Sequence, residues 1–172
     1  MNEQNSSDDI KASRTGRVKS REYRELWNRP GYLVRRLHQI HVGLFAEECG
    51  GEDITPVQFG MLSVLQGGKE MDQLTLSTSV GVDRTSGADV IRRLERRGLL
   101  RRTPSEKDHR AKLIRITEAG TAYVKRVRPM MARAQERFVE PLTVAEREEF
   151  YRLIKMMVDA NSTASRAPLG TV

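Results

Sequence analysis

Apolar side chains recur at helical spacing over most of this chain. Pro30 suits the first turn of a helix, and Gly50-Gly51 should end that helix. Within it, apolar or aromatic positions follow one another every three or four residues, at Leu33, Leu37, Ile40, His41 and Leu44. A second helix is predicted after Thr55, whose hydroxyl can form a capping box with Gln58, and it should end before Gly67-Gly68.

Two short helices are predicted next, from Gln73 to Val80 and from Asp83 to Arg97. Gly81 can end the first of them, and the Asp83 carboxylate can cap the second by accepting from the amides of the first turn. Two short helices joined by a three-residue turn that contains glycine have the spacing of a helix-turn-helix.

After Gly98, Leu99 to Thr103 and Lys112 to Ile116 have the composition of strands. The polar and charged residues from Pro104 to Arg110 lie between them and predict a hairpin loop. This segment would form the wing of a winged helix.

Two helices are predicted after the hairpin. Thr117 can begin a long helix to about Phe138, which Pro129 would bend. A second capping box, Thr143 with Glu146, precedes a last helix to about Ala160. The predicted fold class is therefore mainly α-helical with a small β-hairpin wing, a winged helix-turn-helix with helical extensions at both ends.

The two ends of the chain are polar and show little apolar spacing. We therefore expect a flexible arm over residues 1–20, a single domain over 21–161, and a flexible tail over 162–172. A chain of 172 residues is long enough for one domain of ordinary size and too short for two comfortable ones.

The net charge of +7 is concentrated in one stretch. Between Arg84 and Arg115 there are eleven cations and four acids, whereas the other 140 residues carry equal numbers of each. A neutral body with one positive stretch predicts an anionic partner that is met at one place.

Several classes of protein are disfavoured by composition. The longest uncharged run, Ile54 to Gly68, is too short and polar to span a bilayer, and residues 1–19 lack the apolar core of a signal peptide. The single cysteine, Cys49, fits a reducing compartment. Aromatic residues at 5% are few for stacking single-stranded bases. We expect a cytoplasmic protein that binds double-stranded nucleic acid and no membrane.

Projected on a helix, residues 83–97 have two faces. The face expected to pack on the preceding helices carries Gly87, Val90, Ile91 and Leu94. The opposite face carries Arg84, Thr85, Ala88 and Arg92. The N-terminal residues of such a helix reach base edges, so Arg84 can bind guanine, and Thr85 or Ser86 a base or phosphate. The later arginines are expected at phosphates: Arg92, Arg93, Arg96 and Arg97. A solvated basic face without a partner is the alternative.

Asp89 is unusual on this face because a carboxylate repels phosphate. It can pair with Arg93 one turn further on, which we favour, or accept a hydrogen bond from a cytosine amino group. In the predicted hairpin loop, Arg110 can enter a minor groove and Asp108 can orient its guanidinium. An ordinary polar hairpin loop has the same composition.

Asp108-His109-Arg110, followed after six residues by Thr117-Glu118-Ala119-Gly120, resembles the wing signature of the multiple antibiotic resistance regulator (MarR) family. Residues 81–86 and 94–100 resemble the recognition helix of that family and its exit. Residues 142–147 are similar to the start of its last helix. The resemblance covers roughly residues 30–160.

The resemblance implies a homodimeric winged-helix repressor of transcription that binds a near-palindromic operator. It implies dimerisation helices at about 30–50 and 117–160 and a DNA-binding lobe at about 55–116. Arg84, Thr85 and Ser86 would lie in the major groove, and Arg110, braced by Asp108, in the minor groove. Gly87-Ala88-Asp89 departs from the family pattern, which leaves the base readout open.

Members of the family often release DNA when a small phenolic or carboxylic compound binds between the dimerisation helices and the winged lobe. Residues 29–49 resemble the subgroup that controls the breakdown of aromatic compounds, which implies an aromatic acid, N-heterocycle or coenzyme A thioester as effector. Candidate pocket residues would bind a carboxylate or line a ring: Tyr32, Arg36, His38, His41, Phe59 and Met61. His41 also fits a core or interface position, and Arg36 an ion pair across the dimer.

Other chemistries have weaker support in the sequence. His38 and His41 have a spacing that can hold a metal, but no Glu or Cys completes the ligand set, so we predict neither metal nor cofactor. Glu47 and Glu48 beside Cys49 would raise the thiol pKa, which disfavours redox sensing. Without a nucleophile–base pattern or a phosphate-binding glycine loop, the sequence does not predict an enzyme.

Three classes of function therefore compete. A ligand-responsive, sequence-specific dimer would protect two half-sites about one helical turn apart. A nonspecific or architectural nucleic-acid-binding protein would bind all sequences with the same dependence on salt. An enzyme with a phosphorylated substrate in the basic stretch would turn over without DNA. The first class fits both the charge distribution and the motifs, and is the function that we predict.

Overall fold

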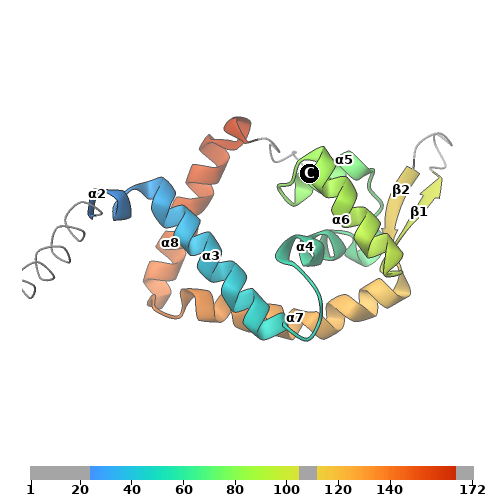
Figure 1. Ribbon diagram of the computed structural model, residues 1–172, viewed down its shortest axis with the longest axis horizontal. Coiled ribbons are helices and arrows are strands. Elements are labelled where there is room, and N and C mark those ends of the chain that lie inside the picture. Colours follow the sequence, from blue (N-terminus) through green and yellow to red (C-terminus); the bar gives the residue numbers. More distant parts are fainter. Residues whose placement is uncertain (1–23, 105–111, 166–172) are drawn as a thin grey trace, which may run out of the picture. The chain divides into compact units, whose positions relative to one another are not determined.

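The computed structural model describes residues 24–104 and 112–165 (Figure 1). The packing divides the chain into two compact units, residues 1–41 and 42–172. The boundary falls inside α3 (Pro30–Cys49), which begins at the predicted proline. The predicted arm, the hairpin-loop residues 105–111 and residues 166–172 lie outside the described residues.

The first unit contains a short helix that the apolar pattern did not indicate, α2 (Arg24–Trp27). The Arg29 amide donates to the Leu26 carbonyl at 3.1 Å, and the Leu33 amide donates to the Arg29 carbonyl, so α3 follows after a tight turn. Leu33 and Ile40, which belong to the predicted apolar stripe of α3, are both exposed in the single chain.

The second unit contains the helix-turn-helix and the hairpin in the predicted order. The capping box at the start of α4 (Pro56–Val64) is present: the Gln58 amide donates to Thr55 Oγ1 at 3.2 Å, and the Thr55 amide donates to Gln58 Oε1 at 3.1 Å. The following elements are η1 (Gln66–Gly68), α5 (Gln73–Ser79), α6 (Arg84–Arg96), β1 (Leu100–Pro104), β2 (Lys112–Ile116), α7 (Glu118–Val139), α8 (Val144–Ala160) and η2 (Ser162–Ala164).

Small differences from the prediction have local causes. β1 includes Pro104, which we expected in the loop, because Pro104 still lies opposite Lys112 in the register. Asp72, which the sequence analysis did not single out, caps α5 by accepting from the amides of Leu74 and Thr75 at 2.8 and 3.0 Å. The turn η2 occupies the first residues of the segment that we predicted as a tail.

The hairpin is antiparallel and gains a third partner. Leu100 lies opposite Ile116, and Arg102 opposite Ile114. Met71 also exchanges two backbone hydrogen bonds with Ile114, at 3.3 and 2.8 Å. This bridge fastens the segment before α5 to the base of the hairpin.

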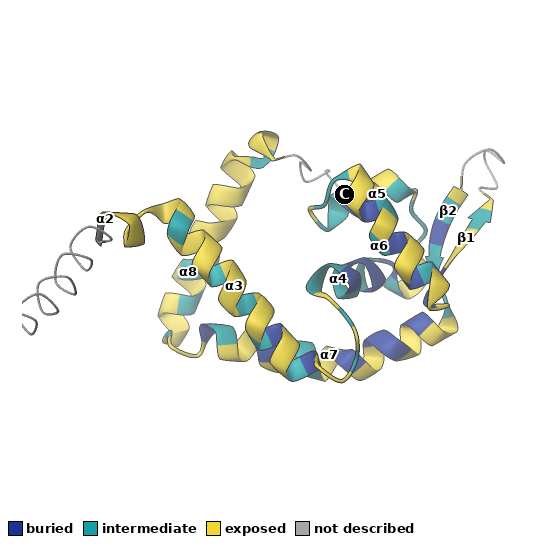
Figure 2. Ribbon diagram, viewed as in Figure 1, coloured by how far each residue is buried: buried dark blue, intermediate teal, exposed yellow. Residues whose placement is uncertain are grey.

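The core of the second unit lies between α6, the hairpin, the helices α4 and α5, and the first part of α7 (Figure 2). As predicted, α6 contributes Ile91 and Leu94, both completely buried. The other large side chains that are completely buried include Met61, Leu62, Leu76, Ile114, Val124 and Val127. This packing leaves the polar face of α6 outside.

α5 and α6 pack closely against each other at Gly87. A Cβ atom at this position would lie 1.9 Å from Ser77 Oγ and 2.5 Å from Ser77 Cβ. Ser77 is completely buried, and its hydroxyl donates to the Gln73 carbonyl at 2.7 Å. Because neither helix has room to accommodate a methyl group, Gly87 sets how closely the two helices of the helix-turn-helix pack.

We expect Gly87→Ala to lower the free energy of unfolding by roughly 1–3 kcal/mol, the usual range for overpacking a well-packed site. Adding Ser77→Gly removes the clashing atoms, so the double variant should be more stable than the two separate losses would give. Urea unfolding measures all three. Gly51→Ala is the control because a Cβ there has no neighbour within 4 Å. Additive losses in the double variant would contradict the contact.

Candidate nucleic-acid interface

The N-terminal end of α6 is capped by the carboxylate of Asp83. Asp83 Oδ1 accepts from the amides of Thr85 and Ser86 at 2.9 and 3.0 Å, and Asp83 Oδ2 accepts from the Ser86 hydroxyl at 2.7 Å. These hydrogen bonds, led by those from Ser86, lower the pKa of Asp83. The Ser86 hydroxyl hydrogen is thereby engaged, so towards an outside group this side chain can act as an acceptor.

The predicted DNA-contacting residues of α6 lie mostly on one accessible surface. Five are exposed and Ala88 is half-buried; the exposed ones are Arg84, Thr85, Ser86, Arg92 and Arg93. The structure therefore brings these six together on a single helix whose opposite side is in the core. Arg96, also expected at a phosphate, is exposed as well, and two further predicted contacts, Asp108 and Arg110, lie outside the described residues.

Asp89 pairs with a different arginine from the one that we favoured. Arg92 Nη1 donates to Asp89 Oδ1 at 2.9 Å, so the partner is three residues away and not four. Both spacings place side chains on the same helix face, and the rotamers decide between them. Arg93 remains exposed beside this pair.

Other cations of the basic stretch are paired with acids at the base of the hairpin. Arg102 Nε lies 3.2 Å from Glu95 Oε2, and Arg115 forms an ion pair with Glu70. Arg101, directly opposite Arg115 in the ladder, is exposed. Fewer of these cations are consequently available to an external anion than the count from the sequence indicates.

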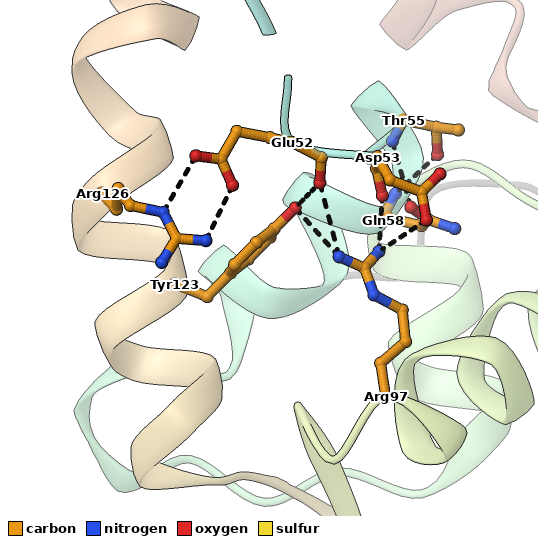
Figure 3. Close-up of polar contacts among 7 residues, drawn as sticks. All are labelled: Glu52, Asp53, Thr55, Gln58, Arg97, Tyr123 and Arg126. Carbon is orange, nitrogen blue, oxygen red and sulfur yellow. Dashed lines mark hydrogen bonds and ion pairs between the residues drawn. The ribbon is translucent and has the colours of Figure 1, made fainter. Parts of the chain in front are cut away.

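Arg97 corrects a further expectation, because its side chain is bound to the protein and not turned towards phosphate (Figure 3). Its Nη1 donates to the Asp53 carbonyl at 2.5 Å, and its Nη2 donates to Tyr123 Oη at 3.1 Å. The Tyr123 hydroxyl in turn donates to the Glu52 carbonyl. These contacts join the last turn of α6 to α7 and to the loop before α4.

The same cluster continues on the other side of the tyrosine ring. The guanidinium carbons of Arg97 and Arg126 lie 5.1 and 5.0 Å from the centre of the Tyr123 ring. Arg126 also forms two hydrogen bonds with the Glu52 carboxylate, at 2.9 and 2.7 Å, and these bonds lower the pKa of Glu52. Sequence reasoning missed the cluster because its hydrogen bonds join residues that are 26 to 74 positions apart.

The predicted ligand-binding residues occupy two helices. On α3, Tyr32 and His41 are half-buried, whereas Arg36 and His38 are exposed. Arg36 donates to Gln39 at 3.3 Å, and burial, with a smaller effect from His38, lowers the pKa of His41. On α4, Phe59 is half-buried and Met61 is completely buried. The α3 residues belong to the first unit and the α4 residues to the second.

Cys49 is buried, and its thiol pKa is raised, first by burial and then by Glu48. A raised pKa leaves less thiolate at neutral pH and so a less reactive sulfur. Among the described residues, no group of three or more His, Cys, Asp or Glu side chains is placed to hold a metal ion. None of the helices in the described ranges has the length and apolar character needed to cross a membrane.

Comparison with known proteins gives a family match over the part of the chain that contains the helix-turn-helix. Residues 52–111 match the model of the MarR family. A transcriptional repressor of Pseudomonas putida, NicR, is 26% identical over 134 residues, which cover 78% of this chain and 85% of NicR. A protein of Thauera aromatica named as a transcriptional regulatory protein for the hcr operon is 31% identical over 64% of this chain and 67% of its own length.

Solved structures with the same fold include three regulators. PcaV from Streptomyces coelicolor, in complex with its natural ligand, is 36% identical over 78% of this chain and 95% of its own, with a TM-score of 0.71. BpsR from Bordetella bronchiseptica, whose DNA binding is regulated by 6-hydroxynicotinic acid, is 27% identical over 77% and 95%, with a TM-score of 0.74. The repressor CouR, bound to a 23-mer DNA duplex, is 26% identical over 79% and 96%, with a TM-score of 0.73.

The Asp83 cap makes a pH-dependent contribution to stability. Because the pKa of Asp83 is lowered in the folded protein, its stabilising effect is present above the ordinary aspartate pKa of 3.8 and is lost as the pH falls through the lower folded value. We expect Asp83→Ala to be less stable than the wild type at pH 7, and the difference to shrink below pH 4. Urea unfolding across this range measures it.

Asp83→Asn is the matched control for this prediction. Asparagine caps helices about as well as aspartate and does not titrate, so the stability difference between Asp83→Asn and Asp83→Ala should stay constant with pH. A wild-type advantage over Asp83→Ala that persists unchanged in acid would show that the carboxylate charge contributes nothing to the cap.

Proposed function

Because the chain belongs to the MarR family of transcriptional regulators, we propose that it is a homodimeric repressor that binds a near-palindromic operator and is released by a small aromatic ligand. The observation that carries this proposal is the exposed, capped N-terminal end of α6, which presents Arg84 and Thr85 at the start of the basic stretch. A helix of this kind enters a major groove with its first residues at base edges.

Each DNA contact that we propose has a distinct chemical role. Arg84 provides the planar fork that binds guanine, and Thr85 and Ser86 provide oxygen atoms for a base or a phosphate. Ala88 leaves room for close approach or contacts a thymine methyl group. Arg92 and Arg93 bind phosphates, and Arg110, oriented by Asp108, enters the minor groove.

The exposed apolar surface supports the homodimer. In the single chain, α8 exposes Val144, Tyr151, Leu153, Ile154, Met156, Met157 and Val158. α3 exposes Leu33, Val34, Ile40 and Val42. Apolar surface of this extent is characteristic of an interaction site. We propose that a second copy of the chain covers it, so that two α6 helices meet one DNA duplex.

The relatives support an aromatic effector. DNA binding by BpsR is regulated by 6-hydroxynicotinic acid, and PcaV has been solved with its natural ligand. In this chain we propose that Arg36, His38 or His41 binds the acidic group of such a ligand, and that Tyr32, Phe59 and Met61 provide apolar contacts with its ring.

A nonspecific or architectural nucleic-acid-binding protein is the second candidate. Such a protein depends on many unpaired cations, since phosphate neutralisation supplies its affinity. Here Arg102 and Arg115 form ion pairs with acids, and Arg97 binds the protein itself. These pairs reduce the general attraction for phosphate and favour the sequence-specific function.

We expect Arg84→Ala and Arg110→Ala each to weaken binding to the preferred duplex by roughly 1–3 kcal/mol, the range of a good specific contact. The preferred duplex is obtained by selection from random DNA with the wild-type protein, and affinities are measured by fluorescence anisotropy. Lys125→Ala, which removes an exposed cation of α7, is the control. Equal losses in all three variants would contradict sequence-specific contacts, as would unchanged affinity in the two arginine variants.

We also expect aromatic acids to release the protein from the selected duplex. The probes are benzoate and 6-hydroxynicotinic acid, with cyclohexanecarboxylate as the non-aromatic control. Arg36→Ala should raise the concentration needed for release roughly ten- to hundredfold, since a hydrogen bond to a charged group contributes about 1.5–3 kcal/mol. Arg29→Ala, which removes an exposed cation just before the start of α3, is the matched variant. Release by none of the aromatic acids would contradict this class of effector.

A further inference from the structure

We propose that Arg97, Tyr123 and Glu52 are positioning residues that fix the direction of α6 relative to α7, and thereby the half-site spacing that the dimer accepts. The inference rests on the proposed function, because half-site spacing has meaning only for a dimer that reads two sites. None of the three residues needs to contact DNA for this role.

The first attachment is at the C-terminal cap of α6, which is Arg97 itself. Its guanidinium donates to the Asp53 carbonyl and to Tyr123 Oη, so the end of α6 is bound to two other segments of the chain. A bidentate, charged donor holds an orientation better than a single hydrogen bond, because both acceptors must be satisfied together.

Tyr123 transmits this attachment to α7. Its hydroxyl accepts from Arg97 and donates to the Glu52 carbonyl, and its ring lies between the guanidinium groups of Arg97 and Arg126. The residue is only 6% exposed. A hydrogen bond that is shielded from water in this way is electrostatically stronger than an exposed one.

The loop that supplies the acceptors is itself held in place. The Glu52 carboxylate accepts two hydrogen bonds from Arg126, which ties the loop to the same face of α7 (Figure 3). Asp53 has φ of 43°, a left-handed conformation that is uncommon for residues other than glycine. The carbonyl of this residue is an acceptor for Arg97, so the strained turn serves to present it.

A second attachment stabilises the exit of α6. Thr117 Oγ1 donates to the Gly98 carbonyl at 2.7 Å, and the Thr117 amide donates to the Leu99 carbonyl at 3.1 Å. With Tyr123 further along α7, the end of α6 is held at two points. Two points of attachment restrict the rotation of the helix end more than a single contact would.

The geometry makes the far end of α6 sensitive to these contacts. Thirteen helical residues span about 20 Å, so a tilt of about 5° at Arg97 would displace Arg84 by about 2 Å. A displacement of this size is enough to break a two-pronged contact with guanine. Loosening the cluster should therefore change which separation of half-sites is bound best, beyond any effect on stability.

The test uses the full chain and three duplexes: the selected one, and versions with one base pair added or removed between the half-sites. Tyr123→Phe removes the hydroxyl and keeps the ring. We expect it to reduce the preference for the selected spacing about three- to tenfold, the equivalent of one or two hydrogen bonds. Arg97→Lys, which keeps the charge and loses the fork, should act in the same direction and decides the question if Tyr123→Phe does not fold.

Val127→Ala is the control, since it opens a cavity in the same helix and removes no hydrogen bond. It should lower the thermal midpoint and leave the spacing preference at the wild-type value. A wild-type spacing preference in folded Tyr123→Phe and Arg97→Lys would overturn the positioning role alone, as would an equal change in Val127→Ala. A wild-type protein without any spacing preference would overturn the proposed function, and this inference with it.

Discussion

The contact between Gly87 on α6 and Ser77 on α5 sets the geometry on which the rest of the second unit depends. It lets the two helices approach until Ile91 and Leu94 reach the core, and it thereby turns the polar side of α6 outward. The Asp83 cap begins the helix at one end, and Thr117 with Tyr123 holds its exit at the other. The first turn of α6 is thus held by the carboxylate cap and by close packing on α5, and its end is held by hydrogen bonds.

Ion pairs within the protein reduce the number of cations in the basic stretch that are available to phosphate. Eleven cations between residues 84 and 115 indicate a strong attraction for phosphate. In the structure, Arg102 and Arg115 are paired with acids, and Arg97 is hydrogen-bonded within the protein. Because these cations are paired, the sequence-independent contribution of phosphate contacts to the binding affinity is smaller. The remaining affinity then depends more on DNA shape and on base contacts.

The fold of the second unit could be predicted largely because its signals are local. Thr55 with Gln58, Asp83, and Thr143 with Glu146 each cap a helix within three residues, and all three caps are present. Glycines at the predicted ends of α5 and α6, Gly81 and Gly98, have positive φ values. Signals of this kind act within a single turn, so that they do not depend on the rest of the fold.

The candidate site was less predictable because its contacts join distant residues or depend on rotamers. The partner of Asp89 could not be chosen from the sequence, since Arg92 and Arg93 share its face. The role of Arg97 depends on Glu52, Asp53 and Tyr123, which no periodicity connects with it. Because Arg97 lies in a basic run, the sequence predicted that it contacts a phosphate. In the structure it instead donates hydrogen bonds to Asp53 and Tyr123.

The central claim is that the chain reads two related half-sites as a dimer. The most direct measurement is a footprint on the DNA that flanks its own gene, made at two salt concentrations with competitor DNA. Our account predicts a protected near-palindrome, with half-sites about one helical turn apart, that persists at physiological salt. Diffuse protection that disappears equally from all sequences as salt rises would contradict it.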